Sequence, residues 1–96
     1  MNKIRRKKLA QIVAKLGAME DLRTEILEDM ETVYNEEQDA LDNLPDSLQT
    51  GERAEQMRDY IYSLEAAMSA LDNVDVESVR DFVTEIYEEG GRLHDR

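Results

Sequence analysis

The sequence contains no cysteine and no tryptophan, and its 96 residues include one phenylalanine, one proline and one histidine. The lack of cysteine excludes a disulfide framework and favours a reducing compartment, so we expect a cytoplasmic protein. Aromatic residues make up 5% of the chain. That fraction is too low for the core of an ordinary β-sandwich or β-barrel.

Long apolar runs are also missing from the chain. No segment approaches the about 20 apolar residues that cross a bilayer. The basic start is not followed by the apolar stretch of a signal peptide, because Gln11 and Lys15 interrupt it. We therefore expect no membrane among the partners of this protein.

Signatures of catalytic and metal chemistry are absent as well. The sequence has no GxxxxGK, HExxH, CxxC or GxSxG pattern. Di-iron helical bundles need Glu-x-x-His pairs, and His94 lies beyond Gly90-Gly91. A partial calcium-loop pattern at Asp72, Asp75 and Glu77 lacks the glycine and the terminal glutamate of such a loop. We predict a protein that is not an enzyme, with no catalytic residues, metal or cofactor.

The residues that are present favour helices. Charged residues make up 36% of the chain, and alanine, leucine, glutamate, methionine and arginine are good helix formers. Pro45 and Gly51 mark one turn, and Gly90-Gly91 marks a helix stop. We expect one helical domain over 1–96, divided into a helix over about 3–42, a turn over 43–51, helices over about 52–72 and 76–89, and a tail over 90–96.

Apolar spacing then predicts the fold class. In the first arm the mean step is about 3.5 residues, since ten steps cover the 35 residues from 9 to 44, the spacing of a coiled-coil seam. The seam residues of this arm are Leu9, Ile12, Leu16, Met19, Leu22, Ile26, Met30, Val33, Glu37, Ala40 and Leu44. Those of the second arm begin with Ala54, Met57, Ile61, Leu64, Met68 and Leu71. We predict an all-α, long antiparallel helical hairpin whose second arm is either kinked near 73–75 or split there, with Asp75 capping a third helix.

The turn carries further expectations. We expect Leu44 and Leu48 to fold inward and Thr50 to cap the next helix. Glu37 is the polar residue of the predicted seam, and it is expected to reach water or to pair with Arg53 or Arg58.

Charge is distributed unevenly around a net value of −11. Residues 1–19 hold six basic residues and no acid, so the remaining chain carries 23 acids against six bases, a net of −17. In a hairpin the basic run lies beside the end of the second arm, where opposite charges would fix the orientation. The acids expected there are Asp81, Glu85, Glu88 and Glu89.

Two surfaces are candidates for binding. The first is an acidic ribbon that could mimic nucleic acid, although a solvated helix face is the plainer reading. The ribbon consists of Asp21, Glu25, Glu28, Glu31, Glu36, Asp39 and Asp42. The second is an apolar face wider than a two-helix seam needs, which predicts an oligomer or partner contact, most simply a homodimer. It consists of Val79, Phe82, Val83, Ile86 and Tyr87.

The turn block carries a resemblance to known proteins. It reads Glu36-Glu37-Gln38-Asp39-Ala40-Leu41-Asp42-Asn43-Leu44-Pro45-Asp46-Ser47-Leu48-Gln49, followed by Gly51-Glu52-Arg53-Ala54-Glu55-Gln56-Met57. With the basic start, it resembles small acidic helical proteins encoded by bacteriophages and prophages of Firmicutes, over about residues 1–72. The resemblance implies a phage origin, a bacterial host cytoplasm and a helical shape, and it implies no activity.

Three functions follow as hypotheses. The first is a non-enzymatic module that binds a host protein, as an inhibitor of a nucleic-acid-handling or defence protein of the anti-CRISPR or anti-restriction type. The alternative is a dimerising structural or adaptor coiled coil with no inhibitory role. DNA binding rests on the basic residues of 3–8 alone, and the net −17 of the remaining chain opposes it, so nucleic acid is expected only through mimicry.

Overall fold

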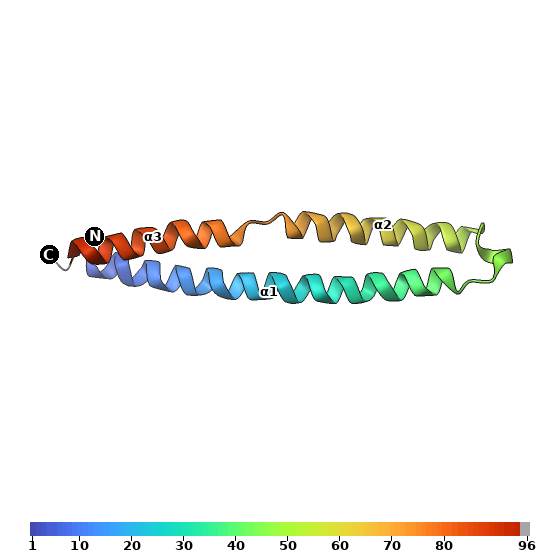
Figure 1. Ribbon diagram of the computed structural model, residues 1–96, viewed down its shortest axis with the longest axis horizontal. Helices are drawn as coiled ribbons and strands as arrows, with labels where there is room; N and C mark the ends of the chain where they lie inside the picture. Colours follow the sequence, from blue (N-terminus) through green and yellow to red (C-terminus); the bar gives the residue numbers. More distant parts are fainter. Residues whose placement is uncertain (95–96) are drawn as a thin grey trace. The chain divides into compact units, whose positions relative to one another are not determined.

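The computed structural model describes residues 1–94, with side chains described through Gly91. It contains helix α1 (Lys3–Asp42), a short 3-10 turn η1 (Asp46–Leu48), helix α2 (Glu52–Asp72) and helix α3 (Val76–His94) (Figure 1). The described residues include no strand. The chain forms two compact units: unit 1 comprises Met1–Arg23 and Asp75–Arg96, and unit 2 comprises Thr24–Val74.

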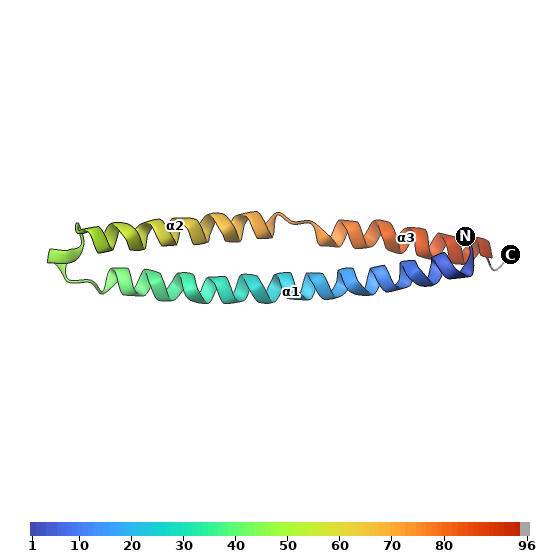
Figure 2. The ribbon, with the colours of Figure 1, turned by 180° about the vertical axis from the view of Figure 1, so that it is seen from behind.

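The prediction of an all-α helical hairpin is confirmed. In unit 2 the chain leaves α1, reverses through η1, and α2 runs back beside α1 (Figure 2). In unit 1 the first part of α1 pairs with α3. The second arm is split between Asp72 and Val76, so of the two predicted forms the separate third helix is the one observed.

Asparagine caps the start of α1. The backbone N–H of Arg5 donates a hydrogen bond of 2.8 Å to Oδ1 of Asn2. This satisfies one of the amides that the first turn of a helix leaves without a partner.

A glutamine closes the other end of α1 and orders the turn. Nε2 of Gln49 donates to the carbonyl oxygens of Leu41 at 2.9 Å and Leu44 at 3.0 Å. Nη2 of Arg58 donates to the carbonyl oxygen of Gln49 at 2.9 Å. The bond to Leu41 adds to the capping of the last turn of α1, and the bonds to Leu44 and Gln49 order the turn that follows.

Two expectations about the turn are wrong. Thr50 does not cap α2, because the N-cap is Gly51 and no side chain caps that end. Glu52 and Glu55 in the first turn suit the positive end of the helix dipole instead. Leu44 packs against the core as predicted, but Leu48 is 48% exposed, since it lies on η1 beyond the ends of both helices.

The helix cap at the split is Asp75. Its Oδ1 accepts a hydrogen bond of 3.0 Å from the N–H of Ser78, the third residue of α3. Hydrogen bonds from Ser78 hold the pKa of Asp75 below its ordinary value of 3.8, with a smaller contribution from the charge of Arg23. The anionic carboxylate is therefore the form that the fold favours.

We expect this cap to make part of the stability acid-sensitive. A pKa that is lower in the folded state contributes stability above the unfolded value, and that stability is lost as the pH falls below 3.8 through the folded value. Asp75→Asn keeps a capping oxygen but does not titrate. In urea unfolding followed by circular dichroism, the wild type should exceed this variant in stability at pH 7, and the difference should shrink toward pH 2. A difference that is constant with pH would contradict the assignment.

The predicted tail over 90–96 is wrong in its first part, because α3 continues through Gly90 and Gly91 to His94. Both glycines are buried in unit 1. A Cβ on Gly91 would lie 2.7 Å from Cζ of Arg6, so the missing side chain makes room for the guanidinium. Gly91 acts as a packing position there, and the cost of about 1 kcal/mol for a glycine within a helix is set against this contact. Residues 95 and 96 lie outside the described residues.

A pair of alanine variants tests this role. Gly90→Ala should raise the free energy of unfolding by up to about 1 kcal/mol, because its Cβ would meet only Met1, with Cβ at 3.4 Å. Gly91→Ala should gain less or nothing, since it displaces Arg6 from the ring of Tyr87. Urea titrations of the two variants provide the measurement, and an equal gain in both would contradict the packing role.

The face of α1 that packs against the second arm differs from the predicted seam. Most of its half-buried and buried positions, together with Leu44 just beyond the helix, alternate steps of three and four residues. They are Arg6, Leu9, Val13, Leu16, Glu20, Arg23, Leu27, Met30, Tyr34, Glu37, Leu41 and Leu44. In heptad notation these are the a positions (6, 13, 20, 27, 34, 41) and the d positions (9, 16, 23, 30, 37, 44). Ala10, Gly17 and Gln38 are also half-buried, each one position after a residue of this set.

Six residues of the predicted seam are exposed on a neighbouring face of the same helix. They are Ile12, Met19, Leu22, Ile26, Val33 and Ala40. The error has a physical cause: two stripes with the same period of about 3.5 residues run along α1, one position apart. The stripe that packs contains four charged residues, and the neighbouring stripe also contains four, so apolar content alone does not separate the two.

The buried core is small in each unit. In unit 2 it consists of Leu41, Ala54, Met57 and Ile61, with Tyr34 and Leu44 packed against it. In unit 1 the buried large hydrophobic residue is Val76, at 3% exposure. The fold therefore leaves much apolar surface without cover inside the chain.

Candidate protein-interaction surface

The exposed stripe of α1 follows the heptad of the packed face. Ile12, Met19, Ile26, Val33 and Ala40 occupy g positions at intervals of seven residues. Between them, the c positions are Lys8, Lys15, Leu22, Asp29 and Glu36. We call these ten residues the c/g stripe. Its five large hydrophobic side chains are between 38% and 56% exposed, although singly placed surface hydrophobics are common in proteins. The regular repetition along one helix is what distinguishes this stripe.

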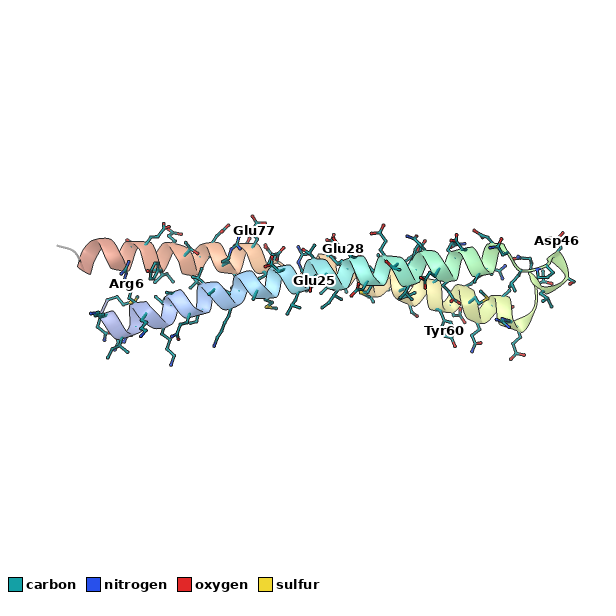
Figure 3. The ribbon with its side chains drawn as sticks, turned by 90° about the horizontal axis from the view of Figure 1, so that it is seen from below. Arg6, Glu25, Glu28, Asp46, Tyr60 and Glu77 are labelled. Atoms are coloured by element: carbon teal, nitrogen blue, oxygen red, sulfur yellow. The ribbon has the colours of Figure 1, made fainter. Side chains whose placement is uncertain are left out.

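In unit 2 the second arm extends the apolar surface beside the stripe. Val33 lines a groove with Tyr60, Ser63, Leu64 and Glu37. Figure 3 shows Tyr60 projecting outward from α2, and 52% of this residue is exposed. An aromatic side chain beside an open apolar groove is a good anchor for a partner.

A second groove in unit 2 has a mixed lining. It is lined by Leu27, Glu31, Met68, Ser69 and Asp72. Between α1 and α2, Oη of Tyr34 donates a hydrogen bond of 2.8 Å to Oε1 of Glu65. This bond raises the pKa of Tyr34 above its ordinary value of 10.0. Both grooves hold apolar side chains, and the groove of Val33 and Tyr60 is the one that adjoins the c/g stripe.

The structure divides the partner face that the sequence predicted on α3. Val79, Phe82 and Ile86 are 47–69% exposed. Val83 and Tyr87 are half-buried, and Cζ of Arg6 stacks 4.3 Å from the ring centroid of Tyr87. Three of the five residues are thus available to a partner, and the other two serve the packing of unit 1.

All seven residues of the predicted acidic ribbon are exposed. Asp21 belongs to unit 1 and the other six to unit 2; Glu25 and Glu28 are labelled in Figure 3. None of the seven makes an ion pair with another described residue. Oδ1 of Asp42 accepts a hydrogen bond of 3.1 Å from Nε2 of Gln38. The ribbon remains a solvated anionic surface, available to a basic partner.

The predicted ion pairs between the basic run and the acids of α3 are not observed. Across the part of the chain with described side chains, no basic residue of 3–15 lies within 4.0 Å of Asp81, Glu85, Glu88 or Glu89. The position of Arg6 explains why: it faces the seam, where Nε donates to the carbonyl oxygen of Tyr87 at 3.4 Å. The four acids are exposed.

Three further charged residues lie within the seam. Glu37 is half-buried at the Val33 groove and forms no ion pair with Arg53 or Arg58 among the described residues, since Arg58 binds the turn. Glu20 and Arg23 pair with each other at 2.6 Å. The hydrogen bond from Arg23 holds the pKa of Glu20 below its ordinary value of 4.5.

Other kinds of site receive no support from the described residues. They contain no group of three or more histidine, cysteine, aspartate or glutamate side chains that could hold a metal ion. None of the helices, over the range that the structure describes, has the length and apolarity needed to cross a bilayer. The sequence matches no protein-family model, no curated protein and no solved structure.

Sequence reasoning missed the c/g stripe as a separate surface and missed Tyr60 as an anchor. The signal was present in the sequence: adjacent apolar residues recur at intervals of seven or fourteen as Ile12-Val13, Ile26-Leu27, Val33-Tyr34 and Ala40-Leu41, and a single seam uses only one residue of each pair. The c positions change from lysine to leucine to acid along the helix. This order along the c positions becomes visible only when the packed stripe and the c/g stripe are considered separately.

Proposed function

We propose that the protein is a non-enzymatic interaction module that assembles with a helical partner through the c/g stripe of α1. The observation that carries the proposal is the exposure of Ile12, Met19, Ile26 and Val33 at intervals of seven residues on a helix whose other face is already packed. A regular apolar column of this kind is suited to receiving the ridge of another helix. The exposed residues of α3 and the groove at Tyr60 would widen the contact.

The resemblance of the turn block to phage and prophage proteins supports a phage origin and action in the cytoplasm of a bacterial host. In that setting the module would serve as a structural or adaptor component. Its function would then be the assembly itself, since no motif for catalysis supports an added activity.

Site-specific photo-crosslinking tests the proposal in cells that produce the protein. A photoreactive phenylalanine analogue placed at Ile26 should form an adduct with a protein. The same analogue at Ala18, an exposed f position on the outer face of α1, is the matched control and should form none. Equal labelling from the two positions, or none from Ile26, would contradict the use of the c/g stripe.

A second candidate function rests on a different observation, the seven exposed carboxylates of the acidic ribbon. Through them the protein would bind the basic surface of a host nucleic-acid-handling or defence protein and inhibit it in the anti-CRISPR or anti-restriction manner. Such binding is electrostatically steered and weakens as salt rises. Titration of the protein into complexes of basic nucleases with DNA at low salt is the test, and an absence of competition would remove this candidate.

A further inference from the structure

We propose that the occupant of the c/g stripe is a second copy of this chain, with the two α1 helices antiparallel about a two-fold axis at Leu22. The inference rests on the proposed function, because it names the partner of the same stripe. It is carried by the order of residues along one continuous helix, Lys3–Asp42.

The apolar residues match in this arrangement. Antiparallel pairing about Leu22 brings together positions whose numbers add to 44 or 45. Ile12 then faces Val33 of the second copy, Met19 faces Ile26, and Leu22 faces its own equivalent. An isologous two-fold contact requires such a self-complementary surface, and the 38–56% exposure of these side chains leaves them free to form it.

The charged residues of the stripe select the antiparallel direction. In the same register, Lys8 faces Glu36 of the second copy and Lys15 faces Asp29. All four are exposed and make no ion pair with a described residue. A parallel pairing would place each lysine against its own equivalent and each acid against its own. Like charges at such flanking positions disfavour a pairing.

The distribution of charge along the whole of α1 also favours antiparallel pairing. Residues 3–23 contain seven basic and two acidic residues, a net of +5, and residues 24–42 contain eight acidic and no basic residues, a net of −8. Antiparallel pairing puts the basic half of one helix against the acidic half of the other. This complementarity offsets the repulsion expected between two chains that each carry a net charge of −11.

The chain exposes more surface than a compact monomer of its mass. The chain exposes 7453 Å², whereas a folded monomer of 11.1 kDa is expected to expose about 5,700 Å². The excess of roughly 1,750 Å² exceeds the about 800 Å² that each partner buries in an interface of standard size. A contact of the stripe with its copy would cover part of this excess.

Each half of the contact joins the unit 1 part of one stripe to the unit 2 part of the other. The two halves are equivalent by the two-fold symmetry. The order of these residues follows from the continuous helix α1, Lys3–Asp42.

Single-cysteine variants give a direct test, because the natural chain contains no cysteine. Under mild oxidation Leu22→Cys should form a disulfide-linked dimer, since only a residue at the axis meets its own equivalent within the about 4.4–6.8 Å between Cα atoms that a disulfide allows. Ile12→Cys alone should stay monomeric. A mixture of Ile12→Cys and Val33→Cys chains should form the cross-linked pair. Ala18→Cys, on the outer face, is the control.

Charge reversal provides a second test that does not depend on oxidation. Lys8→Glu/Lys15→Glu and Asp29→Lys/Glu36→Lys should each raise the dissociation constant of self-association about tenfold or more. An equimolar mixture of the two double variants restores all four opposite-charge pairs, so it should regain the wild-type affinity as a heterodimer. Sedimentation equilibrium at micromolar concentrations measures both effects, and circular dichroism checks that the helices persist.

The outcomes separate this inference from the proposed function. Dimers from Leu22→Cys, none from Ile12→Cys, and restoration by the mixed charge variants support the antiparallel pair. Self-cross-linking of Ile12→Cys would overturn it in favour of a parallel pair. A wild-type chain that remains monomeric would overturn it altogether. If, in that case, the analogue at Ile26 still labels a different protein, the proposed function stands with another partner.

Discussion

Replacement of Leu41 by alanine should lower the free energy of unfolding by about 2–4 kcal/mol, the range for removing a buried leucine side chain from a packed core. Leu41 is 7% exposed and belongs to the core cluster with Ala54, Met57 and Ile61. Few other buried side chains contribute to the core of this unit. The remaining cavity would therefore be poorly compensated, and the variant should lose a large part of a small domain's stability.

Leu22→Ala is the matched control, because it makes the same change on the same helix. Leu22 is 56% exposed, so truncation should change stability by about 0.5 kcal/mol or less. Urea unfolding followed by circular dichroism gives both values. It must be measured at high dilution, so that any contact of Leu22 with a second chain does not contribute. Equal losses in the two variants would show that the packed face of α1 has been assigned wrongly.

The helix ends were readable from local chemistry. Helices α1 and α2 occupy the ranges expected from the sequence, because proline, glycine and capping residues act over a few neighbours. Asp75 was anticipated as a cap for the same reason. The sequence does not decide between one kinked second helix and a separate third helix, since both forms are compatible with the same spacing of apolar residues. The hydrogen bond from Ser78 is the contact that identifies the start of α3.

What remained hidden depends on contacts between distant residues. Gly90-Gly91 read as a helix stop, yet Gly91 lies against Arg6, which is 85 positions earlier in the chain. Gln49 caps the end of α1 with its side chain, and Gly51 is the N-cap of α2, the role expected of Thr50. The packed stripe of α1 includes Arg6, Glu20 and Arg23, and the stripe beside it contains as many charged residues, so hydrophobicity alone does not tell the two apart. Local pattern locates the ends of α1 and α2, whereas contacts between distant residues decide which face is buried and how far α3 extends.

Replacing Ile12, Met19, Ile26 and Val33 together with glutamine should abolish association through the c/g stripe while leaving the helices intact. These side chains are already about half exposed, so the isolated chain loses little by their removal. In a two-chain contact, eight of them would each contribute about 1 kcal/mol by burying their remaining apolar area. Allowing for imperfect burial, we expect the dissociation constant to rise by at least about a thousandfold, or about 4 kcal/mol.

The control for this variant carries four replacements at the same spacing on the outer face, Ala18, Glu25, Thr32 and Asp39 to glutamine. It should associate as the wild type does, because these f positions point away from the c/g stripe. Sedimentation at 0.1 and 0.5 M salt adds a second discriminant. If the acidic ribbon mediates binding, association should weaken as salt rises and should be reduced in the outer-face control. If apolar burial drives association, it should persist at high salt and fail only in the stripe variant. Loss of association in the outer-face control, with unchanged association of the stripe variant, would show that the carboxylates of α1 mediate the interaction.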